Sequence, residues 1–428
     1  MTWAREINFF LEIDPQTLLT MFWYAALIEA PRIMIAVIYL GGRAAVAGAM
    51  GGPLSTAELE FARISRVTIL LPGHNEADSL ERAVIGIHEQ IGIPTQIVVV
   101  DDGSTDEMAA VGRRLKASGL IDVFVSTGLR GGKAAASNLG LTYCTGDYVI
   151  IADIDTSFDR DALVRIIAPF ADPSVGAVSG NIGVRNAEAS LITRFQAIQY
   201  VNSIAMGRRV TDMLMGQFIA SGAFAAFRRA ALDMVGGWAA GPGEDGDVST
   251  QLWRAGWVIR FAADAWALTD VPETLTALLR QRARWNRSFT MLRFRKHVGI
   301  FNPLQANFSL SNAVRLTDSL FFEAIRPAMF FIYMAWLARE LGAEMLPVVV
   351  FVISVYMSVS AVLFVISASA SRPYGRLSLL PYLPGAVLFN GFVLRPASIY
   401  AYLSELLWRR GYQDSFVPGR ILSNIEWF

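Results

Sequence analysis

The feature that most constrains this chain is the position of one short segment, Gln281–Trp285 (QRARW), at a boundary between two kinds of sequence. Before this segment, short apolar runs alternate with longer amphipathic ones, and polar or acidic residues follow the apolar runs. After it, long apolar stretches dominate, near residues 316–338, 345–367 and 379–402. A chain with this pattern is expected to build a water-soluble α/β domain and to place its remaining helices in a membrane.

The overall composition agrees with this division. Of the 428 residues, 54% are hydrophobic and 17% are charged, which is too apolar for an ordinary soluble enzyme and too charged for a protein that is all membrane. The formal net charge is +0, so no global basic field exists to attract nucleic acid, and we expect no nucleic-acid partner. The single cysteine, Cys144, excludes an internal disulfide framework and a Cys-rich metal site.

The first half of the chain predicts a Rossmann-like sheet. Apolar runs at residues 67–71, 97–100 and 148–152 predict strands, and residues 79–90 predict a helix after the first of them. Strands that alternate with helices imply an α/β fold with a mostly parallel sheet covered on both faces, in which ligands bind at the carboxyl ends of the strands. The polar residues that follow these three strands are His74-Asn75-Glu76, Asp101 to Ser104, and Asp153-Ile154-Asp155.

The Asp153-Ile154-Asp155 motif predicts a site for a divalent cation. Side chains alternate along a strand, so the two carboxylates point to the same side. Close carboxylates repel each other unless a cation lies between them, and Mg²⁺ is usually held by few protein ligands together with substrate phosphates. The alternative is a solvated turn that caps the next helix, and the motif alone leaves both interpretations open.

Three further motifs each have a structural and a functional interpretation. The segment from Asp101 to Asp106 either supplies a helix N-cap at Ser104 or Asp106 after a tight turn, or offers a carboxylate that accepts the imide N–H of uracil. Lys133 is either solvated or in contact with phosphate, because the two preceding glycines let the backbone approach a ligand. Glu244 and Asp245 lie at the start of a predicted helix. Either the helix dipole stabilises their negative charge there, or one of them is a general base.

Within the boundary segment, Gln281, Arg284 and Trp285 fall at i, i+3 and i+4 of a predicted helix and share one face. An amide, a cation and an indole together suit a pyrophosphate beside a sugar ring, because Arg binds phosphate oxygens in a fork. The alternative is an interfacial tryptophan with arginine neighbours that extend to the membrane surface. That alternative fits the location but does not explain the order of the upstream motifs.

Together these motifs resemble family 2 glycosyltransferases of the GT-A fold. The similar group is the membrane-integrated one, with chitin-oligosaccharide, hyaluronan, poly-N-acetylglucosamine and cellulose synthases. Each motif is short, but their order and spacing match from about Val67 to Trp285, although His74 stands where the family usually has Tyr. The matching elements are Pro72-Gly73-His74-Asn75-Glu76, Asp101 to Ser104, Gly132-Lys133, Asp153 to Asp155, Ser221-Gly222-Ala223, Glu244-Asp245 and Gln281 to Trp285.

The resemblance implies a role for each matching residue. Asp245 is the implied catalytic base, with Glu244 beside it, and Mg²⁺ or Mn²⁺ is the implied cofactor at Asp153 and Asp155. The implied acceptor-binding residues are Trp285, Ser221 and Gly222. The implied nucleotide-sugar-binding residues are Pro72, His74, Glu76, Asp101, Asp102, Lys133, Asp153, Gln281 and Arg284.

The expected organisation has four parts. Residues 1–50 form an N-terminal transmembrane helix and linker, 51–275 the GT-A domain, 276–310 interfacial amphipathic helices, and 311–428 a C-terminal transmembrane region. The apolar stretch at 379–402 is interrupted by prolines, which favours a re-entrant rather than a spanning segment. The cations after Trp285 are expected to lie against anionic headgroups; they are Arg287, Arg293, Arg295 and Lys296.

Positive charge after the first apolar segment, at Arg43, Arg63 and Arg66, places the α/β domain in the cytoplasm of a multi-pass inner-membrane protein. The expected function is processive, inverting transfer from a UDP-sugar (UDP-N-acetylglucosamine or UDP-glucose) that elongates and exports a β-linked glycan. One alternative is addition of a single sugar to a lipid acceptor. Another is a non-catalytic membrane scaffold or transporter, which has no reason to hold acidic motifs at strand ends. The expected partners are the donor, the growing glycan or lipid acceptor, and membrane lipids.

Overall fold

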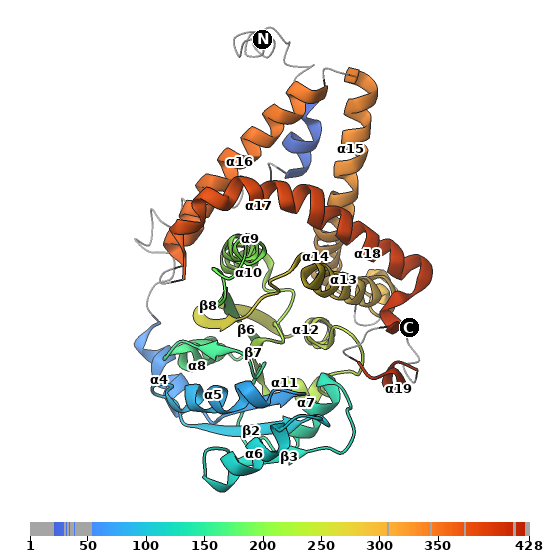
Figure 1. The fold of residues 1–428 in the computed structure, drawn as a ribbon. Helices are drawn as coiled ribbons and strands as arrows, with labels where there is room; N and C mark the ends of the chain where they lie inside the picture. The colour runs from blue at the N-terminus through green and yellow to red at the C-terminus, as the bar shows by residue number, and fades with distance from the viewer. Residues whose placement is uncertain are drawn as a thin grey trace. The chain divides into compact units, whose positions relative to one another are not determined.

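The computed structural model describes residues 21–29, 31, 34, 38, 54–305, 308–342, 345–371, 374–413 and 417–423. The chain divides into two compact units, drawn together in Figure 1. One comprises residues 1–50 and 317–399, and the other residues 51–316 and 400–428. The glycine- and alanine-rich linker predicted at residues 41–53 and half of the first apolar segment, residues 17–40, lie outside the described residues.

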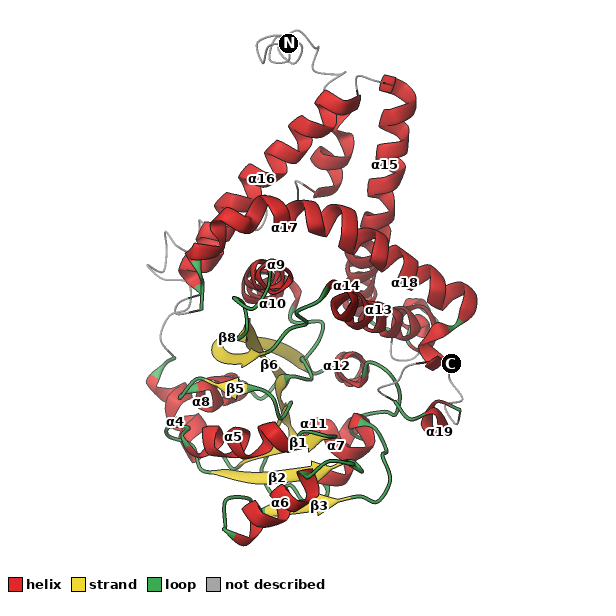
Figure 2. Ribbon diagram, viewed as in Figure 1, coloured by secondary structure: helices red, strands yellow, loops and turns green. Residues whose placement is uncertain are grey.

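The larger unit, residues 51–316 and 400–428, is built on one eight-stranded sheet with the order β3-β2-β1-β4-β7-β6-β8-β5 (Figure 2). Four neighbouring pairs are parallel (β1–β2, β1–β4, β2–β3 and β6–β8), while β4–β7, β6–β7 and β5–β8 are antiparallel. The predicted mostly parallel α/β sheet is therefore confirmed. The strands are β1 (Val67–Gly73), β2 (Thr95–Asp101), β3 (Val123–Ser126), β4 (Tyr148–Ala152), β5 (Ser157–Phe158), β6 (Val175–Val184), β7 (Phe224–Arg228) and β8 (Val258–Thr269).

Helices cover both faces of this sheet. The predicted helix at residues 79–90 is α5, whose bounds are shifted two residues toward the N-terminus. The helices are α4 (Thr56–Ile64), α5 (Ala77–His88), α6 (Met108–Ala117), α7 (Lys133–Leu141), α8 (Ala162–Ile167), α9 (Leu191–Tyr200), α10 (Gly207–Met215), α11 (Arg229–Val235), α12 (Glu244–Arg254), α13 (Leu275–Met291) and α19 (Gly419–Leu422).

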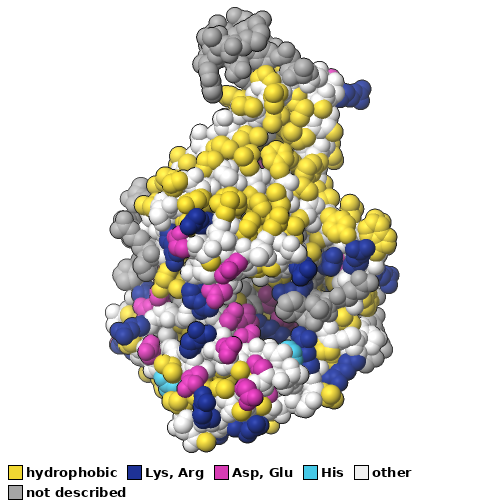
Figure 3. All heavy atoms as spheres, viewed as in Figure 1, with side chains coloured by type: hydrophobic (Ala, Val, Ile, Leu, Met, Phe, Trp, Pro, Cys, Tyr) yellow, Lys and Arg dark blue, Asp and Glu magenta, His cyan; other side chains and the backbone are white. Residues whose placement is uncertain are grey.

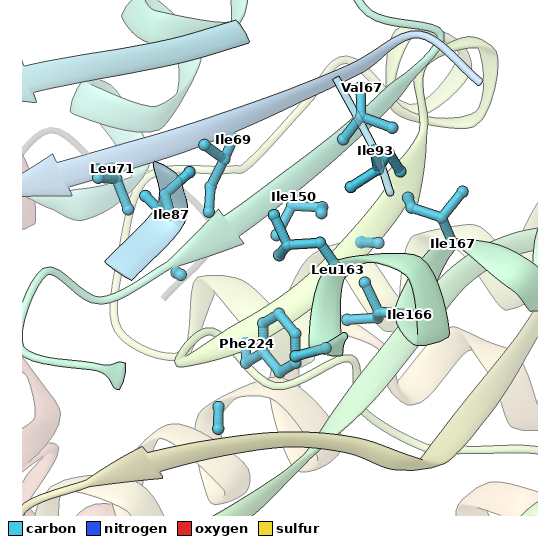
Figure 4. Packing of buried hydrophobic residues seen from close by; sticks show 14 of the residues in the cluster. Val67, Ile69, Leu71, Ile87, Ile93, Ile150, Leu163, Ile166, Ile167 and Phe224 are labelled. Carbon is cyan, nitrogen blue, oxygen red and sulfur yellow. The ribbon is translucent and has the colours of Figure 1, made fainter. Parts of the chain in front are cut away.

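The core forms because neighbouring side chains on a strand point to opposite faces of the sheet. On β1, Ile69 and Leu71 pack into the cluster on the α5 and α8 side, and Leu70 between them joins the cluster on the other side. Figure 4 shows the first cluster, in which Ile150 and Phe224 approach Leu163 from the sheet. All five residues of β4 are buried, as expected for a strand covered on both faces.

Strand register brings the polar loops to one edge of the sheet. Gly73 at the end of β1 pairs with Asp101 at the end of β2, and β4 runs parallel to β1 on its other side. The loops that begin at His74, Asp102 and Asp153 therefore leave the sheet at the same edge. This is the edge at which open α/β sheets bind ligands.

Among the described residues, three helices are long and apolar enough to cross a membrane, at Leu310–Leu341, Met345–Ala370 and Leu377–Trp408. These long helices are composed of the segments α14 (Leu310–Leu320), α15 (Arg326–Leu341), α16 (Met345–Ala370), α17 (Leu383–Phe389) and α18 (Arg395–Trp408). In Figure 3 apolar side chains gather over these helices and charged ones over the α/β unit.

The expected re-entrant break at residues 379–402 is wrong, because helical structure runs without interruption from Leu377 to Trp408. Pro381 lies inside the 3-10 helical segment Leu377–Tyr382, and Pro384 lies in the first turn of α17, which follows that segment directly. Pro396 lies in the first turn of α18, directly after a π-helical segment at Asn390–Leu394. A sequence pattern does not show that prolines are placed where helix segments join.

Charged residues in the smaller unit neutralise one another. Glu29 is 7% exposed and accepts hydrogen bonds from Arg395 Nη2 at 2.9 Å and from Tyr24 Oη at 2.9 Å. Arg326 Nη1 lies 3.8 Å from the same carboxylate. Charges within apolar helices are costly unless they face protein partners, and Glu29, Arg326 and Arg395 do so.

Gly146 is expected to be essential for close contact between the β4 turn and β1. A Cβ atom there would lie 2.6 Å from Thr68 N and 2.8 Å from Arg66 O, and backbone atoms cannot rotate away. We expect Gly146→Ala to destabilise the protein by about 1–3 kcal/mol, measured as a lower thermal midpoint in detergent. The control is Gly86→Ala on α5, where no atom lies within 4 Å and a gain of about 0.4–1 kcal/mol is expected. Equal midpoints for the two variants would contradict the assigned contact.

Candidate active site

Lys133 joins three parts of the sheet edge. It begins α7 directly after Gly132, which has φ 86° and lets the loop turn into the helix. Its Nζ donates hydrogen bonds to Asp153 Oδ1 and, at 2.9 Å, to the carbonyl oxygen of Gly222. The side chains of Lys133 and Asp153 are 28% and 41% exposed, so the ion pair is reachable from solvent. The predicted phosphate-binding lysine and the predicted metal carboxylate are thus neighbours.

The charge of Lys133 is held by surrounding acids. Burial lowers the pKa of the ammonium group, but the carboxylates of Asp153, Glu244 and Asp245 outweigh that effect, and the pKa lies above its usual value. These carboxylates therefore favour the protonated, positively charged form of Lys133. The arrangement can therefore offer a fixed positive charge to a phosphate group.

Glu244 and Asp245 lie in the first turn of α12, and Gly243 before them has φ 77°. Asp245 Oδ2 accepts a hydrogen bond from Gly222 N at 3.2 Å, and its Oδ1 accepts one from Gly246 N at 2.7 Å. The predicted base is therefore held against the predicted acceptor segment. Burial, followed by the charge of Asp245, raises the pKa of Glu244 to about 7.

A second group of carboxylates lies around the loops that follow β1 and β4. Burial, followed by the charges of Asp155, Asp153 and Asp106, raises the pKa of Glu76 to about 7. Burial and the charge of Asp153 also raise the pKa of Asp155. Negative charge is therefore in excess here, and added positive charge would be stabilising.

This excess bears on the predicted metal site. Across the part of the chain that the structure describes, no group of three or more His, Cys, Asp or Glu side chains is arranged to hold a metal ion. The two neighbouring carboxylates, of which Asp153 also pairs with Lys133, nevertheless fit a Mg²⁺ or Mn²⁺ ion that takes its other ligands from phosphate and water. Asp153 and Asp155 are the residues that would hold it.

The loop after β2 is ordered by its own acids. Both oxygens of Asp102 accept backbone hydrogen bonds, from Gly131 N at 2.6 Å and Gly132 N at 2.7 Å. Asp101 accepts hydrogen bonds from Ser104 N at 3.0 Å and from Ser126 Oγ at 2.6 Å. Each carboxylate oxygen keeps a second lone pair, so contact with uracil stays a prediction.

His74 extends this loop network. Its Nδ1 lies 2.9 Å from the carbonyl oxygen of Asp102, which connects the β1 and β2 loops. On the other side of the glycine pair, Arg420 Nη2 donates to Arg130 O at 2.5 Å, and a Cβ atom on Gly132 would lie 3.3 Å from Pro418. The C-terminal segment Val417–Ser423 thus lies against the loop that precedes Lys133, a contact that the sequence did not predict.

Helix α13 carries the boundary segment. Arg284 is close enough to Glu244 to oppose the rise of its pKa, which brings this helix to the N-terminus of α12. Trp285 is 38% exposed, and the guanidinium carbon of Arg282 lies 4.7 Å from its ring centroid. Gln281 Oε1 is buried and has no hydrogen-bond partner among the described residues. These features fit a helix whose polar face awaits a ligand.

The cations after Trp285 do not face headgroups as expected. Arg293 is 2% exposed and donates to Thr250 Oγ1 at 2.7 Å, and Lys296 Nζ lies 2.8 Å from Asp247 Oδ2. Arg295 Nη1 lies 2.8 Å from Glu405 Oε1, which is fully buried. Buried carboxylates on other helices attract Arg295 and Lys296, and a hydroxyl on α12 binds Arg293; all of these partners are distant in the sequence.

Two residues near the site were missed by sequence reasoning. Asp247, the third acid of the α12 loop, is 2% exposed, and its Oδ1 lies 2.7 Å from Nε2 of the equally buried His297. Arg208 on α10 is close enough to Asp245 for that carboxylate to affect its pKa. Only the acidic run around Asp247 was visible as a signal, and nothing in the sequence connected Arg208 to the base.

Comparison with known proteins places this geometry in a family. The model of glycosyl transferase family group 2 matches residues 148–370, which is more than half of the 428-residue chain. The chain belongs to glycosyl transferase family group 2. As a family 2 glycosyltransferase, it has a sequence ancestry that agrees with the resemblance of its motifs.

Similar proteins include polysaccharide synthases. Over 230 residues the chain is 32% identical to the poly-beta-1,6-N-acetyl-D-glucosamine synthase of Staphylococcus aureus strain MSSA476, covering 53% of this chain and 55% of that protein. The protein of the same name from Staphylococcus epidermidis is 30% identical over 228 residues, covering 53% and 55%. The matched region thus spans about half the length of these curated relatives.

The fold of this glycosyltransferase also has a solved counterpart. The mannosyltransferase PcManGT from Pyrobaculum calidifontis, in complex with GDP-Man and Mn²⁺, superposes with a TM-score of 0.55 at 22% identity, covering 87% of this chain and 99% of that one. This likeness shows the GT-A fold, as the motifs had predicted.

Neutralising Glu76 is expected to stabilise the protein at alkaline pH. Its folded-state pKa of about 7 lies above the ordinary 4.5, so its ionised form is disfavoured by folding, and stability is lost as the pH rises through about 7. Without added divalent cation, Glu76→Gln should raise the thermal midpoint at pH 8 by a few degrees, at about 2–4 °C per kcal/mol. At pH 4 the gain should be small.

The matched control for that measurement is Glu89→Gln, an exposed glutamate at the opposite end of α5, which should change the midpoint little at either pH. A lower midpoint for Glu76→Gln at pH 8, or an equal shift at both pH values, would contradict the excess of negative charge around Glu76.

Proposed function

We propose that this glycosyltransferase inverts the anomeric centre of a UDP-sugar and elongates a β-linked glycan, which it exports across the membrane. The observation that carries the proposal is the convergence on Lys133 of the β4 carboxylate Asp153, the acceptor segment at Gly222 and the α12 acids. A phosphate-binding cation beside a candidate base is the minimum that displacement of a nucleoside diphosphate requires.

Each residue has a defined task in the proposed reaction. Lys133 and Arg284 bind the diphosphate and stabilise the charge that develops on it as the sugar–phosphate bond breaks. Asp245 takes the proton of the acceptor hydroxyl as that oxygen attacks the anomeric carbon from the opposite side. Bound Mg²⁺ or Mn²⁺ at Asp153 and Asp155 would supply neutralising charge to the leaving UDP.

Nucleoside and acceptor are proposed to bind on opposite sides of Lys133. Pro72, His74 and Glu76, with Asp101 or Asp102, hold the uridine on the side of the β1 and β2 loops. On the other side, the 38% exposed indole of Trp285 stacks on the acceptor sugar beside Ser221 and Gly222. The Asp245–Gly222 hydrogen bond supports this order, because it fixes the base next to the acceptor segment.

The donor and the product are inferred from chemistry and from relatives. The names of the staphylococcal relatives favour N-acetylglucosamine as the transferred sugar, with UDP-glucose as the second choice. GDP-mannose belongs in any donor screen because the solved neighbour holds GDP-Man. The three apolar helices support placement in the inner membrane with the α/β unit in the cytoplasm, where nucleotide sugars are made.

Product size tests the proposal directly. The full chain in detergent is incubated with labelled UDP-N-acetylglucosamine and either Mg²⁺ or Mn²⁺, and the product is sized by gel filtration. UDP-glucose and GDP-mannose are run in parallel. A polymer supports the proposal; a lipid carrying a single sugar would instead establish the non-processive alternative.

Replacing the base should abolish turnover without weakening nucleotide binding. We expect Asp245→Asn to lower kcat by about 10²–10⁴-fold, the usual contribution of a general base, with an unchanged Kd for UDP. The control is Asp233→Asn on α11, whose exposed carboxylate forms an ion pair with Arg229 at 2.9 Å. Unchanged turnover in Asp245→Asn would remove Asp245 from the role of base.

Trp285→Ala should raise the KM for a soluble glycan acceptor more than the KM for the donor, because the indole supplies an apolar plane for the acceptor sugar. Trp285→Phe keeps an aromatic ring, so its acceptor KM should lie between those of Trp285→Ala and the wild type. Initial rates at varied acceptor and varied donor measure both constants. Equal losses for donor and acceptor would show that Trp285 is only a packing residue.

A further inference from the structure

Arg208 is a cation near the proposed base that the mechanism leaves without a task. It lies on α10, and its Nη1 donates a hydrogen bond to Ser179 Oγ on β6 at 2.9 Å. Ser179 is fully buried. Among the residues that the structure describes, no carboxylate lies within ion-pair distance of Arg208. A partly buried guanidinium with a hydroxyl as its hydrogen-bond partner is costly to keep, which indicates that it serves a ligand.

The position of Arg208 is tied to the acceptor segment. Ser179 Oγ, which holds the guanidinium, also accepts a hydrogen bond from Ser221 N at 3.4 Å. The next residue, Gly222, donates its backbone N–H to Asp245 Oδ2 at 3.2 Å. Arg208 and the base are therefore anchored to two consecutive residues of one loop. Burial lowers the pKa of Arg208, and the charge of Asp245 opposes that effect, which agrees with this proximity.

Polar side chains of α9 and α13 lie between Arg208 and Trp285. Tyr200 on α9 is 7% exposed, and both Arg208 and Arg282 act against the rise of its pKa caused by burial. Arg282 Nη2 donates a hydrogen bond to Gln199 Oε1 at 2.9 Å. The guanidinium carbon of Arg282 lies 4.7 Å from the ring centroid of Trp285. Helices α9 and α10 thus present polar groups from the base to the indole. Lys133, which faces the proposed diphosphate, contacts the carbonyl oxygen of Gly222, whereas Asp245 contacts its N–H.

We propose that Arg208 binds the terminal sugar of the acceptor, donating hydrogen bonds from its guanidinium to neighbouring oxygen atoms of that sugar and so holding the attacking hydroxyl against Asp245. The planar fork of the guanidinium matches two oxygens on adjacent ring carbons. Arg208 thereby selects acceptors by the arrangement of those oxygens, while Trp285 binds the apolar face of the ring. This inference rests on the proposed function and adds a specificity determinant to it.

The experiment uses the full chain in detergent with a saturating donor and a soluble β-1,6-linked N-acetylglucosamine tetrasaccharide as the varied acceptor. We expect Arg208→Gln to raise the acceptor KM by ~10–100-fold, the range for hydrogen bonds to a charged group. The donor KM and the slow hydrolysis of donor by water should match wild type, because neither uses the acceptor sugar. Arg208→Lys keeps the charge but loses the forked pair of donors, so its acceptor KM should lie between those of wild type and Arg208→Gln.

The matched control is the neighbouring Arg209→Lys, since Arg209 pairs with Asp264 at 3.2 Å on another face of α10. Its acceptor KM should equal that of wild type. If Arg208→Gln has a lowered thermal midpoint, Ser179→Ala replaces it: the guanidinium then loses its anchor but remains present, and a smaller rise in acceptor KM with unchanged donor KM is expected.

An unchanged acceptor KM in Arg208→Gln, or a donor KM that rises by the same factor, would overturn the inference while leaving the proposed function intact. A wild-type protein that transfers sugar from no nucleotide donor would instead overturn the proposed function itself, and the role of Arg208 with it. The Asp245→Asn variant separates these cases, because it loses turnover only if sugar transfer occurs.

Discussion

The ion pair between Lys133 and Asp153 is the interaction on which the site depends. It joins the start of α7 to the loop after β4, and the second hydrogen bond of Lys133, to Gly222 O, fixes the proposed acceptor segment at the same point. Without this cation, Asp153, Glu244 and Asp245 would repel one another. Three loops that are far apart in the sequence therefore meet at the positive charge of Lys133. A bound diphosphate would place its negative charge beside the same cation.

Buried ion pairs continue this organisation away from the site. Asp247 on α12 lies 2.8 Å from Lys296 Nζ and 2.7 Å from His297 Nε2, directly after α13. These contacts connect the helix that carries the proposed base to the helix that carries Trp285. Because breaking a buried pair leaves an uncompensated charge, the two helices are expected to move together rather than independently.

Much of the sheet could be predicted because its strands follow simple periodicities. β1, β2 and β4 are apolar runs followed by acids, and parallel register brings their ends to one edge without further information. The motif residues Lys133, Asp153 and Asp245 were found individually, and the resemblance supplied their order. The apolar stretches after Trp285 likewise predicted helices, because composition alone sets their length.

The remaining features depend on contacts that no local pattern records. The pairing of Asp247 with His297 spans fifty positions, and the hydrogen bond of Arg208 to Ser179 spans 29. The segment that carries Arg293 and Lys296 has an amphipathic pattern, yet both side chains bind buried partners on other elements. The uninterrupted helix at residues 377–408 was missed for a related reason, because a proline is tolerated at the start of a helical segment.

A structure of the full chain with UDP and Mn²⁺ bound, determined by cryo-electron microscopy, tests the central claim most directly. The account predicts the diphosphate beside Lys133 with the ion held at Asp153 and Asp155, the uracil at the His74 loop, and Asp245 and Trp285 both facing the space beyond the phosphates. Nucleotide bound elsewhere, or a diphosphate separated from Asp245 by the sheet, would contradict it.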